Sequence, residues 1–195
     1  MRTVVRNITW MLLSQSVTWG LSLVLLVLAP RWLGDVNFGK AFVATTFVGF
    51  FELLANLGTT TYLTKEIARN TSLASSLVVN LTVAKAVWAV LLGFISVGVA
   101  MLLGYDSILV VLVAWCAVSM VFTTLQGSVA SGLNGLQRMG GLAVAGVVQK
   151  VVATILIVLV LSAGWGVVWY TAVGSVAMLI YLLAPMAPGG AALDG

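Results

Sequence analysis

Long apolar runs dominate this 195-residue chain and restrict what it can fold into. Each run is close to the roughly 20 residues that a helix needs to cross the hydrocarbon core of a bilayer. Backbone polar groups in that core must bond within their own segment, so the runs are expected to fold as helices. The six predicted spans cover residues 8–28, 41–63, 77–103, 108–133, 142–161 and 167–184.

The composition leaves no segment for an aqueous domain, because 62% of the residues are hydrophobic and only 7% are charged. We therefore expect an all-α membrane protein, a six-transmembrane-helix bundle over residues 1–184. Two prolines, Pro185 and Pro188, break the last helix, and residues 185–195 form a linker-like tail.

Charges at the span ends predict the orientation in the membrane. The net charge is +4, and Arg2, Arg6 and the basic residues of the 64–70 connection fall on one side. The positive-inside rule then places both termini in the cytoplasm of a multi-pass protein of the plasma (inner) membrane. The basic residues are scattered rather than clustered, so no nucleic-acid partner is expected.

Catalytic and metal-binding patterns are missing from the sequence. The chain has no His, and Cys116 is its one cysteine, so a Cys/His metal site is excluded and no cofactor is expected. There is no Walker-type Gly-rich loop, and Glu66 and Asp106 are isolated acids of the predicted loops. The sequence therefore predicts that the protein is not an enzyme.

Three charges, Glu52, Lys85 and Lys150, lie inside apolar runs, at similar depth in the inner half of the membrane. Each costs about 2.5 to 3.5 kcal/mol near the bilayer centre, so pairing, water or a ligand must offset them. Glu52 could form a structural ion pair with one lysine. Alternatively, the surplus cation could bind an anionic substrate in a water-filled cavity, or Glu52 could couple transport to protons.

Polar side chains recur at helical spacing along three of the spans, which places each set on one helix face. The sets are Ser14, Gln15 and Thr18, then Thr45, Gly49, Glu52 and Asn56, then Ser119, Thr123 and Gln126. We expect these faces to turn toward a common interior or to hydrogen-bond between helices. The candidate substrate-binding residues are Lys85, Lys150, Glu52, Asn56, Gln15 and Gln126.

Tryptophans occur at two depths. Three of them, Trp10, Trp32 and Trp165, lie near the span ends. Three others, Trp19, Trp88 and Trp115, lie deeper in the spans. The first group fits an aromatic belt at the membrane interfaces. The second group predicts core packing rather than stacking against sugars.

Three segments resemble polysaccharide and oligosaccharide flippases. Residues 30–40, Pro-Arg-Trp-Leu-Gly-Asp-Val-Asn-Phe-Gly-Lys, resemble the R-x-LG-x-x-x-(F/Y)-G signature that follows their first helix. Residues 56–58, Asn-Leu-Gly, and 64–69, Thr-Lys-Glu-Ile-Ala-Arg, are similar to the segment that closes their second helix. Residues 131–139 are similar to the turn after their fourth helix.

The resemblance implies the polysaccharide-transporter branch of the multidrug/oligosaccharidyl-lipid/polysaccharide exporter superfamily. Its members flip lipid-linked glycans by alternating access, with two six-helix lobes around a central, often cationic cavity. This chain would be the amino-terminal lobe, and thus a fragment or half of a larger transporter. Arg31 and Gly34 would belong to the first outer loop, and Lys65, Glu66 and Arg69 to the first inner loop.

The implied partners are a polyprenyl-diphosphate-linked glycan, the lipid bilayer, and a second lobe or a second copy of the chain. Two other functions stay open at this point. The chain could be one lobe of a cation-coupled multidrug exporter, or a lone lobe that binds a membrane partner without transporting anything.

Overall fold

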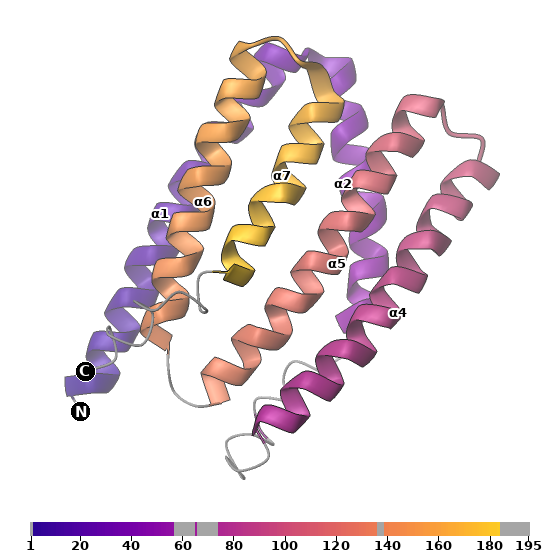
Figure 1. The fold of residues 1–195 in the computed structure, drawn as a ribbon. Coiled ribbons are helices and arrows are strands. Elements are labelled where there is room, and N and C mark those ends of the chain that lie inside the picture. The colour runs from indigo at the N-terminus through magenta and orange to yellow at the C-terminus, as the bar shows by residue number, and fades with distance from the viewer. Residues whose placement is uncertain (1, 57–64, 66–73, 136–138, 184–195) are drawn as a thin grey trace.

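The computed structural model describes residues 2–56, 65, 74–135 and 139–183, and within these it contains helices and no strand. The all-α class predicted from the sequence is confirmed. The six described helices are α1 (Arg2–Leu33), α2 (Asp35–Asn56), α4 (Ala74–Leu102), α5 (Ser107–Gly135), α6 (Met139–Ser162) and α7 (Gly166–Leu183) (Figure 1).

Five of these helices are long and apolar enough to cross a membrane, so the chain is a multi-pass membrane protein. The candidate spans are Leu12–Leu33, Asp35–Asn56, Val79–Leu102, Ser107–Ser128 and Val144–Ser162. In the sixth helix the side chains are described as far as Met178, and over that part the apolar stretch is Gly166–Met178. Large apolar side chains such as Leu23 and Phe94 are exposed on the outer faces, where lipid would surround them.

The first connection is much shorter than the sequence suggests. Pro30 and its neighbours belong to the last turn of α1, and Gly34 is the one residue between α1 and α2. Gly34 has a φ of +75°, a left-handed conformation that glycine adopts without strain, and its N–H donates to the Pro30 carbonyl at 2.9 Å. The second helix therefore begins at Asp35 instead of residue 41.

The other described helix ends lie within a few residues of the predicted spans, except that α1 runs from Arg2 to Leu33 rather than over residues 8–28. Several predicted features lie outside the described residues: the end of the second span, Glu66, Arg69 and the tail at 185–195.

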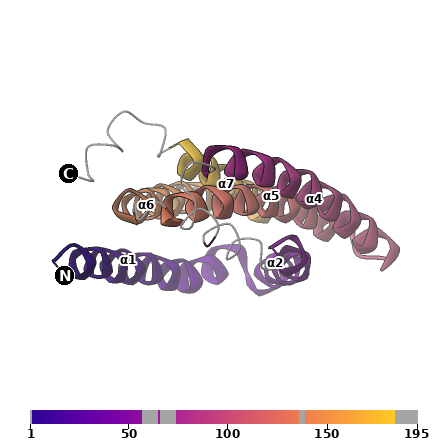
Figure 2. The same cartoon turned by 90° about the horizontal axis from the view of Figure 1, so that it is seen from below.

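The helices form two layers, which Figure 2 shows from one end of the bundle. One layer holds α1 and α2, and the other holds α4, α5, α6 and α7. Helix α5 packs against α4, α7 and α2, whereas α1 packs mainly against α6 and touches α2 much less. The centre of the core is on α5, where Leu112, Val113 and Met120 are fully buried beside Ala44 of α2 and Ala89 of α4.

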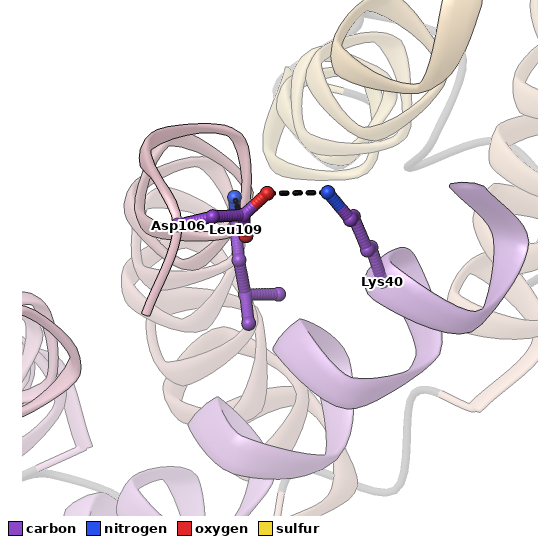
Figure 3. A network of polar contacts seen from close by, with 3 residues as sticks. All are labelled: Lys40, Asp106 and Leu109. Atoms are coloured by element: carbon purple, nitrogen blue, oxygen red, sulfur yellow. Dashed lines mark hydrogen bonds and ion pairs between the residues drawn. The ribbon is translucent and has the colours of Figure 1, made fainter. Parts of the chain in front are cut away.

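The turn between α4 and α5 is fastened to the start of α2 (Figure 3). One carboxylate oxygen of Asp106 forms an ion pair with Lys40, and the other accepts the backbone N–H of Leu109 at 3.3 Å, which caps α5. Tyr105 meets Phe47 of α2 edge to face, at 5.9 Å between ring centroids. Asp106 is thus not the isolated loop acid that the sequence suggested, and the Lys40 hydrogen bond holds the pKa of its carboxyl below its usual range.

Candidate functional site: a lysine-lined cavity between the two layers

A cavity of about 260 Å³ lies where α1, α2, α6 and α7 meet. Each helix contributes one polar side chain to its wall: Ser22, Thr45, Lys150 and Tyr170. The rest of the wall is aliphatic and aromatic, and includes Leu26 of α1 and Phe42 of α2. Lys150 therefore places an ammonium group in a mostly apolar cavity within the membrane.

The polar groups of the cavity divide into acceptors and donors. The hydroxyl of Ser22 donates to the Thr18 carbonyl at 2.9 Å, and that of Thr45 donates to the Ala41 carbonyl at 2.8 Å. Their hydrogens are engaged, so these oxygens face the cavity as acceptors. Within the described residues the structure records no hydrogen bond or ion pair for the Lys150 ammonium or the Tyr170 hydroxyl. These two donors are suited to an oxyanion, because charge-assisted hydrogen bonds to anions are the strong ones.

Lys85 has a different environment although it is also a lysine inside an apolar run. It lies on α4, is 6% exposed, and donates to the side-chain oxygen of Asn56 at 3.3 Å. The neighbouring Trp88 donates its indole N–H to the Leu54 carbonyl at 3.4 Å. Lys85 and Asn56, two of the candidate binding residues, thus form a tie between α4 and α2, apart from the wall of the Lys150 cavity.

Glu52 lies on the same face of α2 as Thr45, two helical turns further along the helix. It is half-buried, and among the described residues no ion pair joins its carboxylate to Lys85 or Lys150. At 1.5 Å per residue, Glu52 and Lys85 each lie about 25 Å from the helix ends near Gly34 and Gly104, whereas Lys150 lies about 18 Å from the matching end of α6. The three charges therefore do not share one depth.

The polar face of α5 contacts α7. The hydroxyls of Ser119 and Ser175 are 2.6 Å apart, and the Thr123 hydroxyl donates to the sulfur of Met178 at 3.2 Å. Gln126 donates its side-chain amide to the Met178 carbonyl at 2.9 Å. Interhelical hydrogen bonding thus accounts for this face, and a substrate-binding role for Gln126 stays a prediction.

The prediction of core packing was wrong for two of the three deep tryptophans. Trp19 on α1 is 65% exposed and Trp88 on α4 is 46% exposed, whereas Trp115 on α5 is half-buried. Trp32 and Trp165 are exposed near helix ends, as an aromatic belt requires, and Trp165 stacks edge to face on Trp169 at 5.3 Å between ring centroids.

Sequence reasoning missed Ser22 and Tyr170. Tyr170 lies in the first turns of a largely apolar helix, and it belongs to none of the polar faces predicted from the sequence. Its place in the cavity follows from how α7 packs against α6 and α5, which is tertiary information. Among the described residues, no group of three His, Cys, Asp or Glu side chains forms a metal site.

Comparisons with known proteins give one finding. A family model described as polysaccharide biosynthesis protein matches residues 4–187, which is nearly the whole chain. No curated protein and no solved structure matches it.

Proposed function

The chain belongs to the polysaccharide biosynthesis protein family, and from that premise we propose that it helps to move lipid-linked glycan precursors across the membrane. In this proposal the cavity between α1, α2, α6 and α7 binds the diphosphate that joins a polyprenyl lipid to its glycan. The observation that carries it is the Lys150 ammonium, which faces a cavity within the membrane with no recorded partner among the described residues.

A diphosphate suits the chemistry of this cavity. Lys150 supplies a charge and three N–H donors, and Tyr170 supplies one O–H donor. The volume of about 260 Å³ is many times the roughly 10 to 15 Å³ that one water molecule needs, so the cavity has room for a ligand of several atoms. An uncompensated cation inside the membrane is costly, so an anionic ligand that pairs with it gains affinity.

Translocation also needs a second moving part. Alternating access works by rocking one helix bundle against another around a fixed site. We propose that a second six-helix lobe, or a second copy of this chain, packs against the α1–α2 layer, and that both termini lie in the cytoplasm beneath the plasma (inner) membrane. The role assigned to the protein is transport, without a catalytic residue.

The experiment is a set of lysine substitutions in cells that depend on this protein for glycan export. Lys150→Gln is expected to lower export at least tenfold while the amount of protein in the membrane stays normal, since a cavity residue contributes binding rather than packing. The measurement is exported glycan per membrane-inserted protein, by glycan blot and quantitative immunoblot.

Two further variants serve as controls. Lys65→Gln removes the same charge from an exposed lysine and should leave both readouts unchanged. Lys150→Arg keeps the charge and should retain part of the export. Wild-type export by Lys150→Gln at wild-type protein level would overturn the proposed site.

A further inference from the structure

We propose that Trp19 and Gln15 form a sugar-binding subsite beside the Lys150 cavity, which holds the sugar ring attached to the diphosphate. This inference rests on the proposed function and deepens it, because it assigns two side chains to the sugar of the same ligand. Neither residue lines the cavity itself, so the subsite is an extension of its wall.

The placement follows from the register of α1. Gln15, Trp19, Ser22 and Leu26 are separated by steps of four, three and four residues, which puts them on one helix face. Ser22 and Leu26 belong to the cavity wall. Trp19 and Gln15 therefore continue that wall toward the amino-terminal end of α1, in the direction in which α1 and α2 diverge (Figure 1).

The indole N–H of Trp19 lies deep in the span and has no recorded hydrogen-bond acceptor among the described residues. Trp19 lies within the candidate span Leu12–Leu33, about 14 residues or roughly 21 Å from its end at Leu33, and so below the interface where tryptophans usually sit. Its ring is 65% exposed, and the structure records no hydrogen bond for its N–H within the described residues. Trp88, the other deep and exposed tryptophan, donates to the Leu54 carbonyl. A polar group left in hydrocarbon without a partner is costly, so Trp19 needs a polar neighbour from outside the described residues.

The side chain of Gln15 indicates which kind of ligand could supply the polar group that Trp19 needs. Its side chain is exposed one turn from Trp19, and an amide offers two donors and two acceptor positions. A sugar ring matches both residues, because its C–H face packs on an aromatic ring and its hydroxyls bond to an amide. The rise from Ser22 to Trp19 is about 4.5 Å, which is comparable to the width of one sugar ring. A sugar next to the phosphoryl groups would therefore lie over Trp19.

The test compares two probes on the full chain in lipid nanodiscs: a short polyprenyl diphosphate, and the same lipid carrying one N-acetylhexosamine. The wild type should bind the glycosylated lipid more tightly. Trp19→Ala should reduce that preference about threefold to tenfold, as expected for the loss of an aromatic stacking contact, and leave the affinity for the bare lipid unchanged. Trp19→Phe, which keeps a ring, should retain most of the preference.

The control variant is Trp169→Ala, which removes an exposed tryptophan in the first turn of α7 and should change neither affinity. Equal affinities of Trp19→Ala and the wild type for both lipids would overturn the subsite. The subsite would also be overturned if Trp19→Ala or Trp19→Phe changed the oligomeric mass of the protein and left its lipid preference intact. Trp19 would then contact another bundle instead of a sugar. A different result would contradict the proposed function: an affinity of Lys150→Gln for the bare lipid diphosphate equal to that of the wild type.

Discussion

At the scale of single residues, the partner decides what a lysine inside an apolar helix does. Lys85 and Lys150 are the same residue type, and each lies within an apolar run of the sequence. Lys85 donates to Asn56 and joins two helices, whereas Lys150 faces a cavity and has no recorded partner within the described residues. Removing one partner of a buried hydrogen-bonded charge is destabilising, because the other partner keeps its desolvation cost. The two lysines should therefore respond differently to the same substitution.

Lys85→Met is expected to lower the free energy of unfolding by about 1.5 to 3 kcal/mol, the range for a hydrogen bond to a charged group. The reason is that the Asn56 side chain loses a donor while it stays between α2 and α4. The measurement is thermal unfolding of the purified protein in detergent. Glu52→Gln is the matched control and should leave the unfolding temperature near the wild-type value, because the structure records no ion pair for Glu52 among the described residues. Equal stability of Lys85→Met and the wild type would contradict a stabilising role for the hydrogen bond between Lys85 and Asn56.

At the scale of elements, the turns hold the helices in register through single residues. Gly34 alone separates α1 from α2, and its φ of +75° is one that side chains with a Cβ rarely adopt. The α4–α5 turn depends on Asp106, which caps one helix and pairs with another. Each turn can be tested by one substitution.

Gly34→Ala should destabilise the bundle by about 1 to 2 kcal/mol, the cost of the left-handed conformation in a residue with a Cβ. Steric overlap adds nothing, since a Cβ at Gly34 meets no atom within 4 Å. Gly98→Ala is the matched control, because Gly98 is helical and also has open space around its Cβ. The measurement is the thermal unfolding temperature of both variants relative to the wild type. A Gly34→Ala protein as stable as Gly98→Ala would mean that the turn tolerates the side chain.

Asp106 gives the α4–α5 turn a dependence on pH. Its pKa is lowered from the ordinary 3.8 by the Lys40 hydrogen bond, so the folded state favours the ionised carboxylate. That contribution to stability is present above pH 3.8 and is lost as the pH falls through the lowered value. Asp106→Asn, which still caps α5, should be less stable than the wild type at neutral pH and equally stable in strong acid.

The measurement for Asp106 is the unfolding temperature of both proteins as a function of pH. The pair is exposed, so concentrated salt should narrow the difference at neutral pH. A difference that persists unchanged in strong acid would show that the ion pair is not its cause.

The sequence predicts the helices well and their contacts poorly. Hydropathy over some 20 residues is a local property, which is why the apolar spans emerge from the sequence alone. Helical spacing likewise identified the polar face of α5 correctly. What that face meets depends on how helices pack, and Gln126 bonds to α7 instead of lining the Lys150 cavity. Tyr170 and the exposure of Trp19 belong to the same class of tertiary information.

At the scale of the whole molecule, the two layers are joined unevenly. Helices α2, α4 and α5 pack together at the core, and the α4–α5 turn adds the Lys40 ion pair. Helix α1 packs mainly on α6 and has few contacts with α2. The cavity lies between the two layers, with α1 and α2 on one side and Lys150 and Tyr170 on the other. Leu25, Ala29 and Leu33 hold the carboxyl-terminal part of α1 in the core, so small movements of α1 would change the width of the cavity mainly toward its amino-terminal side.

The one-residue link at Gly34 gives such movements a direction. A link this short has no slack, so the ends of α1 and α2 that it joins cannot separate. Any swing of α1 must pivot there and spread the two helices at their far ends. In the proposed transport, this bundle would admit a large ligand from the side of the membrane at which α1 and α2 spread, and the proposed second bundle would provide the surface for its release toward the other side.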